Sequence, residues 1–493
     1  MPLPAMSPAH QKALGAWYTP PEVVAALVAW AVRRPGDRLL DPACGDGRFL
    51  ARHSRAAGVD CDPEAITAAS GTAPHSTLVC SDFFEWAAGT SSRFECAAGN
   101  PPFIRYQRFS GRTRQRARTL AAAQGVQFSG LASSWAPYLV ATASLLRPGG
   151  RMAFVVPAEI GHAPYAAPLV AWFATRFARL RIAAIRQKLF PALSENTWLL
   201  FADGFGGSTD ALEFAILDRF QTNADATPAE TVSLAAWRRW GRRLRPFLLP
   251  WTVRAAYRDA VELGGTTTLG RIARVGIGYV SGDNRFFHLR PSRAQQLQIP
   301  EALLEPTVRS GRDLGNGAVT EQTVAQWRAD DAPNFLLRLD AASAEAPGVR
   351  RHLDSEAGQT ARQRYKCRIR NPWYAVPQAK APHLFLSYLS TDTPRLVENR
   401  AGCVCANAVH AVHLRNGGLL PQSIAPRMLC RQWRTPLTAL SCEVEGHPLG
   451  GGVLKLEPRE ALRVAVTAQE LPDESDRLFR QGTGRLQKWR RRG

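Results

Sequence analysis

Short apolar runs that end in a polar residue recur in the first part of the chain. The runs are 38–41, 56–60, 77–82 and 93–100, and their polar ends are Asp41, Asp60, Asp82 and Asn100. Short apolar segments bounded by turn residues are typical of buried parallel strands. We therefore predict four strands whose carboxyl ends share one edge of a sheet, the edge where open α/β sheets bind ligands.

A helical pattern precedes the first of these strands. Thr19 and Glu22 have the spacing of a capping box, and Pro20 stands at the expected first helical position. Apolar residues recur with helical spacing at positions 23, 24, 27 and 31. We predict a helix from Pro20 to about Arg34, capped by Thr19, with aromatic residues ahead of it that could close over a ligand.

The first predicted strand leads into a glycine-rich turn, Asp41 to Gly47, which we expect to be followed by a helix. Gly45 and Gly47 let the backbone approach a ligand closely. A strand, a glycine-rich turn and a helix form a nucleotide-binding unit, although a plain turn has the same letters. The spacing is not G-x-G-x-x-G, and Asp41 and Asp46 would repel a pyrophosphate. A zwitterionic or cationic ligand fits better.

The sequence Asn100-Pro101-Pro102-Phe103 follows the fourth predicted strand. Each proline has a fixed φ and no N–H, and the residue before a proline is held extended. Asn100 therefore presents a carboxamide, Pro101 a carbonyl and Phe103 an aromatic face. The two oxygens can accept from one amino group while the ring stacks on a flat heterocycle. The competing interpretation is an ordinary proline turn.

Length and charge extend this picture. A chain of 493 residues is expected to form two or three domains. The composition changes after about residue 206, and a basic stretch with two tryptophans covers 237–245, so we predict domains at 1–245 and 246–493. The net charge of +21 favours a polyanionic partner, most simply nucleic acid. We expect the basic tail 485–492 to fray.

Cysteine and lysine positions narrow the class of protein. The nine cysteines lack the paired spacing of a zinc site, so we expect reduced thiols and no metal. The sequence has no run of 18 apolar residues, which predicts a soluble cytoplasmic protein with no membrane partner. None of the six lysines follows an acidic residue by two positions, which disfavours a fused nuclease with a D/E-x-K motif.

The order of these motifs resembles that of class I S-adenosylmethionine-dependent methyltransferases, and specifically the adenine-N6 DNA methyltransferases of the TaqI type. The matching segments are Trp17-Tyr18-Thr19-Pro20, Asp41 to Gly47, Asp60, Asp82-Phe83 and Asn100 to Phe103. The resemblance is strong over 15–203 and weak from 270 onward. It implies an α/β fold, a Rossmann-like domain with a mostly parallel seven-stranded sheet, followed by an α+β target-recognition domain that binds DNA.

The resemblance also implies roles for single residues. The cofactor S-adenosyl-L-methionine would be lined by Thr19, Asp41, Ala43, Gly45, Asp60, Cys61, Asp82, Phe83 and Pro102. Within this set, Asp82 would accept from the adenine amine of the cofactor, and Phe83 would pack on its ring. Asn100, Pro101, Pro102 and Phe103 would form the catalytic turn. Phe190, in the family's late motif 187–201, would pack against the target base, or else be a core residue.

The activity implied by the resemblance is methyl transfer to N6 of an adenine flipped out of double-stranded DNA, in restriction-modification or phage defence. It leaves open whether a separate restriction endonuclease or other defence-system subunits accompany the chain. Two alternatives stay open. Enzymes that methylate RNA base amines or protein glutamine share the N-P-P-[YF] motif, and a non-catalytic DNA-binding subunit could keep the same core.

Overall fold

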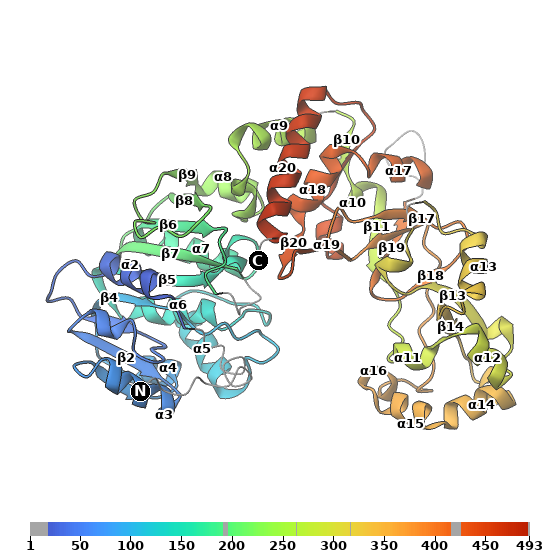
Figure 1. The fold of residues 1–493 in the computed structure, drawn as a ribbon, viewed down its shortest axis with the longest axis horizontal. Helices are drawn as coiled ribbons and strands as arrows, with labels where there is room; N and C mark the ends of the chain where they lie inside the picture. Colours follow the sequence, from blue (N-terminus) through green and yellow to red (C-terminus); the bar gives the residue numbers. More distant parts are fainter. Residues whose placement is uncertain (1–17, 191–195, 263, 316, 416–424, 492–493) are drawn as a thin grey trace. The chain divides into compact units, whose positions relative to one another are not determined.

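The computed structural model describes residues 18–190, 196–262, 264–315, 317–415 and 425–491 (Figure 1). The chain divides into two compact units between Leu248 and Leu249, and the second unit extends to Arg490. Each unit has its own strands and its own buried core, and each is described by itself. None of the described helices is both long and apolar enough to cross a lipid bilayer.

The first unit is built on one nine-stranded sheet with the order β3-β2-β1-β4-β5-β7-β6-β8-β9. The strands are β1 (Leu39–Asp41), β2 (Ala56–Asp60), β3 (Thr77–Cys80), β4 (Phe94–Gly99), β5 (Leu146–Pro157), β6 (Phe177–Ile185), β7 (Thr197–Phe205), β8 (Ala211–Leu217) and β9 (Ala229–Ser233). Strands β1 to β5 pair in parallel, whereas β7 is antiparallel to both of its neighbours. This confirms the predicted mostly parallel seven-stranded sheet, to which β8 and β9 are added at one edge.

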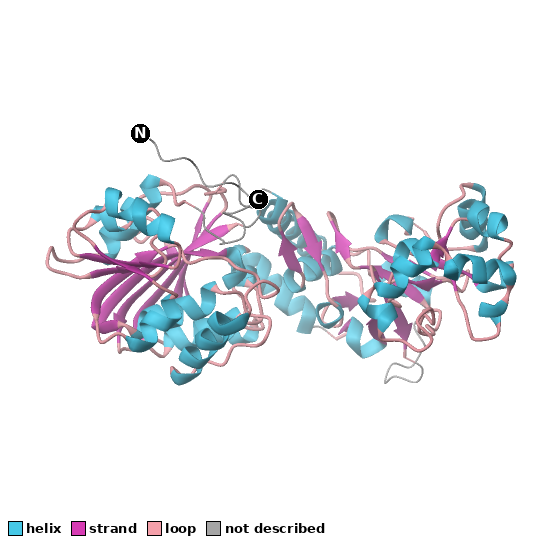
Figure 2. Ribbon diagram, turned by 90° about the horizontal axis from the view of Figure 1, so that it is seen from below, coloured by secondary structure: helices cyan, strands magenta, loops and turns pink. Residues whose placement is uncertain are grey.

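Helices lie on both sides of this sheet (Figure 2). They are α2 (Pro21–Ala31), α3 (Pro63–Thr72), α4 (Phe83–Gly89), α5 (Gly111–Ala123), α6 (Trp135–Ser144), α7 (Ala166–Ala174) and α8 (Leu234–Arg239). One core cluster joins Val23, Val24 and Leu27 of α2 to buried residues of β1, β4, β5, β6 and β7. Burial on both faces explains why the strands have nearly continuous apolar runs instead of alternating ones.

Two local predictions about the start of this unit are wrong. Helix α2 has Pro20 as its N-cap with no side-chain cap, so Thr19 does not form a capping box. The reason is that Pro21 occupies the first helical position and holds Pro20 extended, with ψ of 141°. The expected helix after Gly47 is only a 3-10 turn, Leu50–Arg52, because β2 begins at Ala56 and leaves no room for more.

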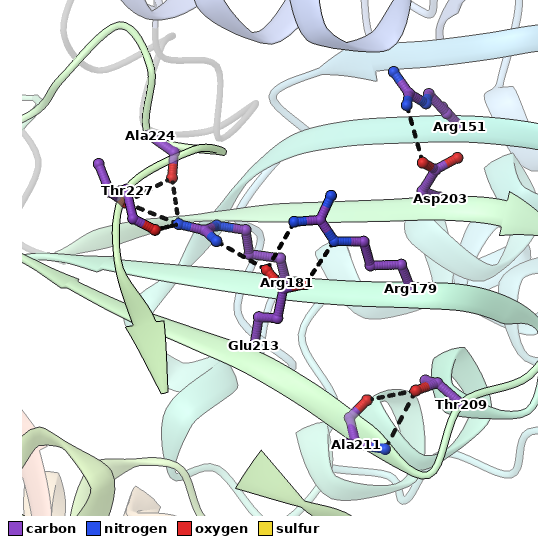
Figure 3. Close-up of polar contacts among 9 residues, drawn as sticks. All are labelled: Arg151, Arg179, Arg181, Asp203, Thr209, Ala211, Glu213, Ala224 and Thr227. Carbon is purple, nitrogen blue, oxygen red and sulfur yellow. Dashed lines mark hydrogen bonds and ion pairs between the residues drawn. The ribbon is translucent and has the colours of Figure 1, made fainter. Parts of the chain in front are cut away.

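A network of ion pairs crosses β5 to β8 on this sheet (Figure 3). Glu213 pairs with Arg179 at 2.6 Å and with Arg181 at 2.8 Å, and Arg151 pairs with Asp203 at 3.0 Å. The hydrogen bond from Arg179 lowers the pKa of the Glu213 carboxyl, despite its partial burial. Arg181 is buried and also donates to the carbonyl of Ala224 at 3.0 Å, which ties the segment before β9 to the sheet. Part of the chain's basic excess is therefore committed internally.

The second unit is α+β, as predicted. Its sheets have the orders β11-β19-β15-β17, β12-β14-β13-β18, β16-β21-β20 and β10-β22. The strands are β10 (Thr266–Thr268), β11 (Ala273–Ile277), β12 (His288–Leu289), β13 (Leu304–Val308), β14 (Phe335–Leu337), β15 (Leu384–Ser387), β16 (Leu389–Ser390), β17 (Leu396–Glu398), β18 (Val404–Cys405), β19 (Val409–Leu414), β20 (His447–Leu449), β21 (Val453–Lys455) and β22 (Ala465–Thr467).

The helices of the second unit surround these small sheets (Figure 1). They are α9 (Trp251–Glu262), α10 (Leu269–Ile272), α11 (Asn284–Phe287), α12 (Pro291–Leu297), α13 (Glu321–Ala329), α14 (Pro347–Asp354), α15 (Glu356–Gln363), α16 (Tyr365–Arg368), α17 (Pro426–Gln432), α18 (Pro436–Glu445), α19 (Pro458–Ala461) and α20 (Asp473–Arg491). The prediction of a frayed tail is wrong for 485–491. In α20, Leu486 and Trp489 are buried, and buried Arg490 pairs with Glu443 at 2.8 Å.

Candidate active site

A cavity of about 340 Å³ lies at the carboxyl-terminal edge of β1, β2, β3 and β4. The polar residues predicted at the four strand ends, Asp41, Asp60, Asp82 and Asn100, all line it. The other predicted residues that line it are Thr19, Ala43, Gly45, Cys61, Phe83 and Pro102. The parallel sheet brings these side chains together because its strands end at one edge.

Three predicted residues are not among those that line the cavity. Pro101 is buried beside it in the sequence, within the catalytic turn. Phe190 is 5% exposed and belongs to the core cluster of the first unit. Phe103 is partly buried and packs against the same cluster. Contact of either aromatic ring with a target base stays a prediction. Residues 191–195 of the late motif, and Trp17 of the aromatic loop, lie outside the described residues.

The glycine-rich turn is fixed by backbone hydrogen bonds to the strand-end carboxylates. The N–H of Gly45 donates to Asp60 at 2.9 Å, and the N–H of Ala43 donates to Asp41 at 3.2 Å. Gly47 has a φ of +81°, and a Cβ there would lie 2.9 Å from the Cα of Ala69 in α3. Only glycine fits this close approach, so the turn is held against the sheet by both sequence and packing.

The cavity is acidic. Burial, followed by repulsion from Asp60 and Asp46, raises the pKa of the Asp41 carboxyl to about 8. Burial also raises the pKa of Asp60, although the N–H groups of Asp62 and Gly45 stabilise its carboxylate. Carboxylates that resist ionisation this strongly gain most from a cationic neighbour. The electrostatics therefore suit a ligand with positive charge and disfavour a free pyrophosphate.

Arg48 is a functional candidate that sequence reasoning missed. Its guanidinium donates to the carbonyl of Thr19 at 2.6 Å, pairs with Asp46 at 2.6 Å, and lies 4.6 Å from the ring centroid of Tyr18. It thereby links the loop before α2 to the glycine-rich turn. Thr19 is 1% exposed, and its hydroxyl has no hydrogen-bond partner within the described part of the chain. That hydroxyl is available to a ligand in the cavity.

Helices α5 and α6 complete the wall around the end of β3. Asp82 caps α4 by accepting from the N–H of Glu85 at 3.1 Å, and its other oxygen accepts from the hydroxyl of Thr113 at 2.6 Å. Phe83 is buried and stacked on Tyr138, with ring centroids 5.1 Å apart and an interplanar angle of 17°. Thr113 and Tyr138 both line the cavity, although no motif in the sequence indicated either.

The catalytic turn is held from the other side by Ser134, which is fully buried at the start of α6. Its hydroxyl donates to the carbonyl of Pro102 and accepts from the N–H of Ile104 at 2.9 Å. Gly99 just before the turn leaves no space for a side chain, because a Cβ there would lie 2.6 Å from Oδ1 of Asp41. The turn and the first strand are thus packed directly against each other.

The strand order and the polar strand ends around one cavity define a Rossmann-like class I methyltransferase fold. Residues 242–489, half of the chain, match the family described as "Type II methyltransferase M.Eco57I, C-terminal domain", and residues 3–66 match the "N-6 DNA Methylase" family. The chain belongs to the type II methyltransferase family of M.Eco57I, and its enzyme class is that of the adenine-N6 DNA methyltransferases.

Individual relatives agree with this assignment. The type II methyltransferase M.XamI of Xanthomonas campestris pv. amaranthicola is 23% identical over 477 residues, which cover 92% of this chain and 85% of M.XamI. M.TthHB8I of Thermus thermophilus is 31% identical over 169 residues, 31% of this chain and 37% of that protein. The solved type IIG restriction endonuclease BpuSI is 14% identical with a TM-score of 0.42, and covers 94% of this chain. This chain spans 59% of the BpuSI chain.

Proposed function

We propose that this protein transfers a methyl group from S-adenosyl-L-methionine to the N6 amine of an adenine that has been flipped out of double-stranded DNA. The observation that carries the proposal is the convergence of Asp41, Asp60, Asp82 and Asn100 on one cavity. Such a cavity offers acidic and hydrogen-bonding groups at one end and an amide at the other. This arrangement suits a cationic cofactor beside a substrate amine.

The residues present fit S-adenosylmethionine, which supplies an electrophilic methyl group on a positively charged sulfur. The acidic wall around Asp41 suits its ammonium and sulfonium charges, and the buried hydroxyl of Thr19 has no other hydrogen-bond partner in the described residues. Asp60 stands at the end of the second strand, where an acidic residue binds ribose hydroxyls. Asp82 would accept from the adenine amine, and Phe83 would pack on that ring.

Asn100 and Pro101 would activate the substrate. An adenine amine is a poor nucleophile because its lone pair is delocalised into the ring. When the Asn100 side chain and the Pro101 carbonyl accept its two hydrogens, the lone pair is localised and directed at the methyl group. This is catalysis by positioning and electrostatics. Phe103, with Phe190, would hold the base, which must leave the helical stack to reach the cavity.

The two parts of the chain would divide the work. Residues 1–245 would hold the cofactor and the reacting amine, and residues 246–493 would recognise the DNA target, in keeping with the family match over 242–489. Direct recognition would use base edges, while arginines contact phosphates. We place the protein in the cytoplasm, in restriction-modification or phage defence, where a separate endonuclease or other defence subunit would be its partner.

Expression in cells that lack adenine methylation, followed by long-read sequencing, tests this function. We expect N6-methyladenine in one sequence context, and none in cells that express the Asn100→Ala variant. Methylation found only on RNA bases or on protein glutamine would contradict the proposal and favour the alternative substrates. A protein that binds DNA but transfers no methyl group to DNA, RNA or protein would be a non-catalytic subunit.

A further inference from the structure

The second unit contains a cavity that the proposed methyl transfer does not use. It has a volume of about 620 Å³ and is lined by parts of α11, α12 and α15 and by the residue that follows β13. Five arginines contribute to its wall: Arg285, Arg290, Arg293, Arg309 and Arg364. We call it the arginine cavity. Its acidic wall residues are Asp283 and Glu356, so cationic side chains outnumber carboxylates.

The carboxylates near this cavity leave much of its charge unbalanced. Asp283 caps α11 by accepting from the N–H of Arg285 at 2.9 Å, and its side chain lies 3.4 Å from Arg364. Arg290 lies 3.9 Å from Asp331. Within the described residues, neither Arg285 nor Arg309 forms an ion pair with a carboxylate. A cavity with unbalanced guanidinium groups attracts an anion.

Buried polar atoms indicate that the arginine cavity is a binding site and not an accidental hollow. The Nε of Arg309 is buried and has no hydrogen-bond partner among the described residues. An arginine N–H can only donate, so a ligand that satisfies it must bring an acceptor. His288 is 4% exposed, and burial and the charge of Arg309 lower its pKa to about 4, which keeps the ring neutral. The positive charge of the cavity therefore comes from arginine alone.

The surface next to the cavity favours an extended anion over a small one. Arg364 lines the cavity and is the N-cap of α16. Helix α16 continues with Lys366 and Arg368, which are exposed, and with Tyr365, which is 63% exposed. Basic residues interleaved with an exposed aromatic ring are typical of contact with a nucleic acid strand. A single small phosphate would leave this row of charges unused.

We propose that the arginine cavity binds a backbone phosphate of the DNA substrate and that α16 follows the same strand. The inference rests on the proposed function for the identity of the polyanion. Guanidinium groups bind phosphate oxygens with paired hydrogen bonds, and Arg309 would gain the acceptor that its Nε lacks. The contact would be independent of sequence, so it would position DNA on the second unit without specifying the target.

The test compares two full-length double variants that lose the same charge. Arg285→Ala/Arg293→Ala removes two exposed arginines of the cavity, and Arg477→Ala/Arg480→Ala removes two exposed arginines of α20. Affinity for a labelled duplex is measured by fluorescence anisotropy over a range of KCl concentrations. We expect the cavity variant to lose at least about tenfold in affinity and its salt slope to become shallower by about one to two. The α20 variant should stay close to the parent protein.

Further arms separate the remaining outcomes. Arg309→Gln, checked for folding by thermal unfolding, should weaken duplex binding in the same way. Equal losses in both double variants, or an unchanged salt slope in the cavity variant, would overturn the proposal. If inorganic phosphate at matched ionic strength stabilised the parent but not Arg309→Gln, and duplex binding were unchanged, the cavity would belong to a small phosphate ligand and the DNA assignment would be wrong. A parent protein that bound DNA but methylated none would refute the proposed function instead.

Discussion

The hydroxyl of Thr113 donates a 2.6 Å hydrogen bond to Asp82, which joins helix α5 to the end of β3. The second oxygen of the same carboxylate accepts from the N–H of Glu85 and caps α4. A carboxylate has about four lone-pair positions, so Asp82 can keep both bonds and still accept from an amine. One hydroxyl therefore sets both the orientation of Asp82 and the seat of α5 beside the cavity.

Replacing Thr113 by valine keeps the shape of this contact and removes its hydrogen bond. We expect Thr113→Val to bind S-adenosylmethionine about 3- to 30-fold more weakly, because a hydrogen bond to a charged group contributes on the order of 1–2 kcal/mol. Isothermal titration calorimetry measures the affinity directly. The Thr113→Ser variant retains the hydroxyl and should behave like the parent. Identical affinities of the valine and serine variants would show that Asp82 is oriented without Thr113.

The raised pKa of Asp41 predicts a pH-dependent stability. The carboxyl has a pKa of about 8 in the folded protein against an ordinary value of 3.8. Between these values the folded state binds more protons than the unfolded chain, so this group makes the free energy of unfolding fall as the pH rises from about 4 to about 8. Asp60 acts in the same direction. Below about pH 4 the destabilising contribution of Asp41 disappears.

The Asp41→Asn variant isolates this effect, since its amide cannot ionise. We expect the variant to gain stability relative to the parent between pH 5 and pH 8 in urea denaturation without cofactor. Asp203→Asn is a suitable control, because that carboxylate pairs with Arg151 away from the cavity. A constant difference between Asp41→Asn and the parent across this range would mean that Asp41 is ionised in the folded protein throughout.

The aromatic residues Phe103 and Phe190 can be separated experimentally. Phe190 is buried in the core, so Phe190→Ala should lower the free energy of unfolding by about 3–5 kcal/mol. Phe190→Leu preserves most of the volume and should leave both stability and methyl transfer largely intact if the ring is only a core residue. Phe103→Leu should lower kcat/KM for DNA at nearly unchanged stability. A stable Phe190→Leu variant with lost transfer would instead indicate that Phe190 contacts the base.

The parts of the site that the sequence predicted are those fixed by local pattern. Asp41, Asp60 and Asn100 follow apolar runs, and a parallel sheet necessarily brings strand ends together. Thr113 and Tyr138 could not be predicted, because they reach the cavity from helices whose position depends on tertiary packing. Helix α5 has only small buried residues, Ala117 and Ala121, so its six-arginine neighbourhood resembled a polar loop.

Long-range partners also explain the failures near the ends of elements. The basic residues of 485–491 resemble a frayed tail, yet Arg490 is buried because Glu443, 47 positions earlier, neutralises it. Arg48 stands next to the glycine-rich turn, but its role follows from contact with the Thr19 carbonyl, 29 positions away. Such pairings leave no periodic signal in the sequence.

The most direct test of the mechanism is the Asn100→Ala variant. Asn100 lies at the end of β4 on the wall of the cavity, whereas the acidic residues and Thr19 line its cofactor side. Loss of the carboxamide removes an acceptor for the adenine amine and leaves the cofactor contacts in place. We therefore expect methyl transfer to fall by at least about 100-fold, the scale of losing one preorganised transition-state contact, while the affinity for S-adenosylmethionine stays within a few fold of the parent. Calorimetry and transfer of radiolabelled methyl groups to duplex DNA measure the two properties on one preparation. Near-normal turnover would show that Asn100 is only the first residue of a proline turn, and a parallel loss of cofactor affinity would place it in the cofactor site.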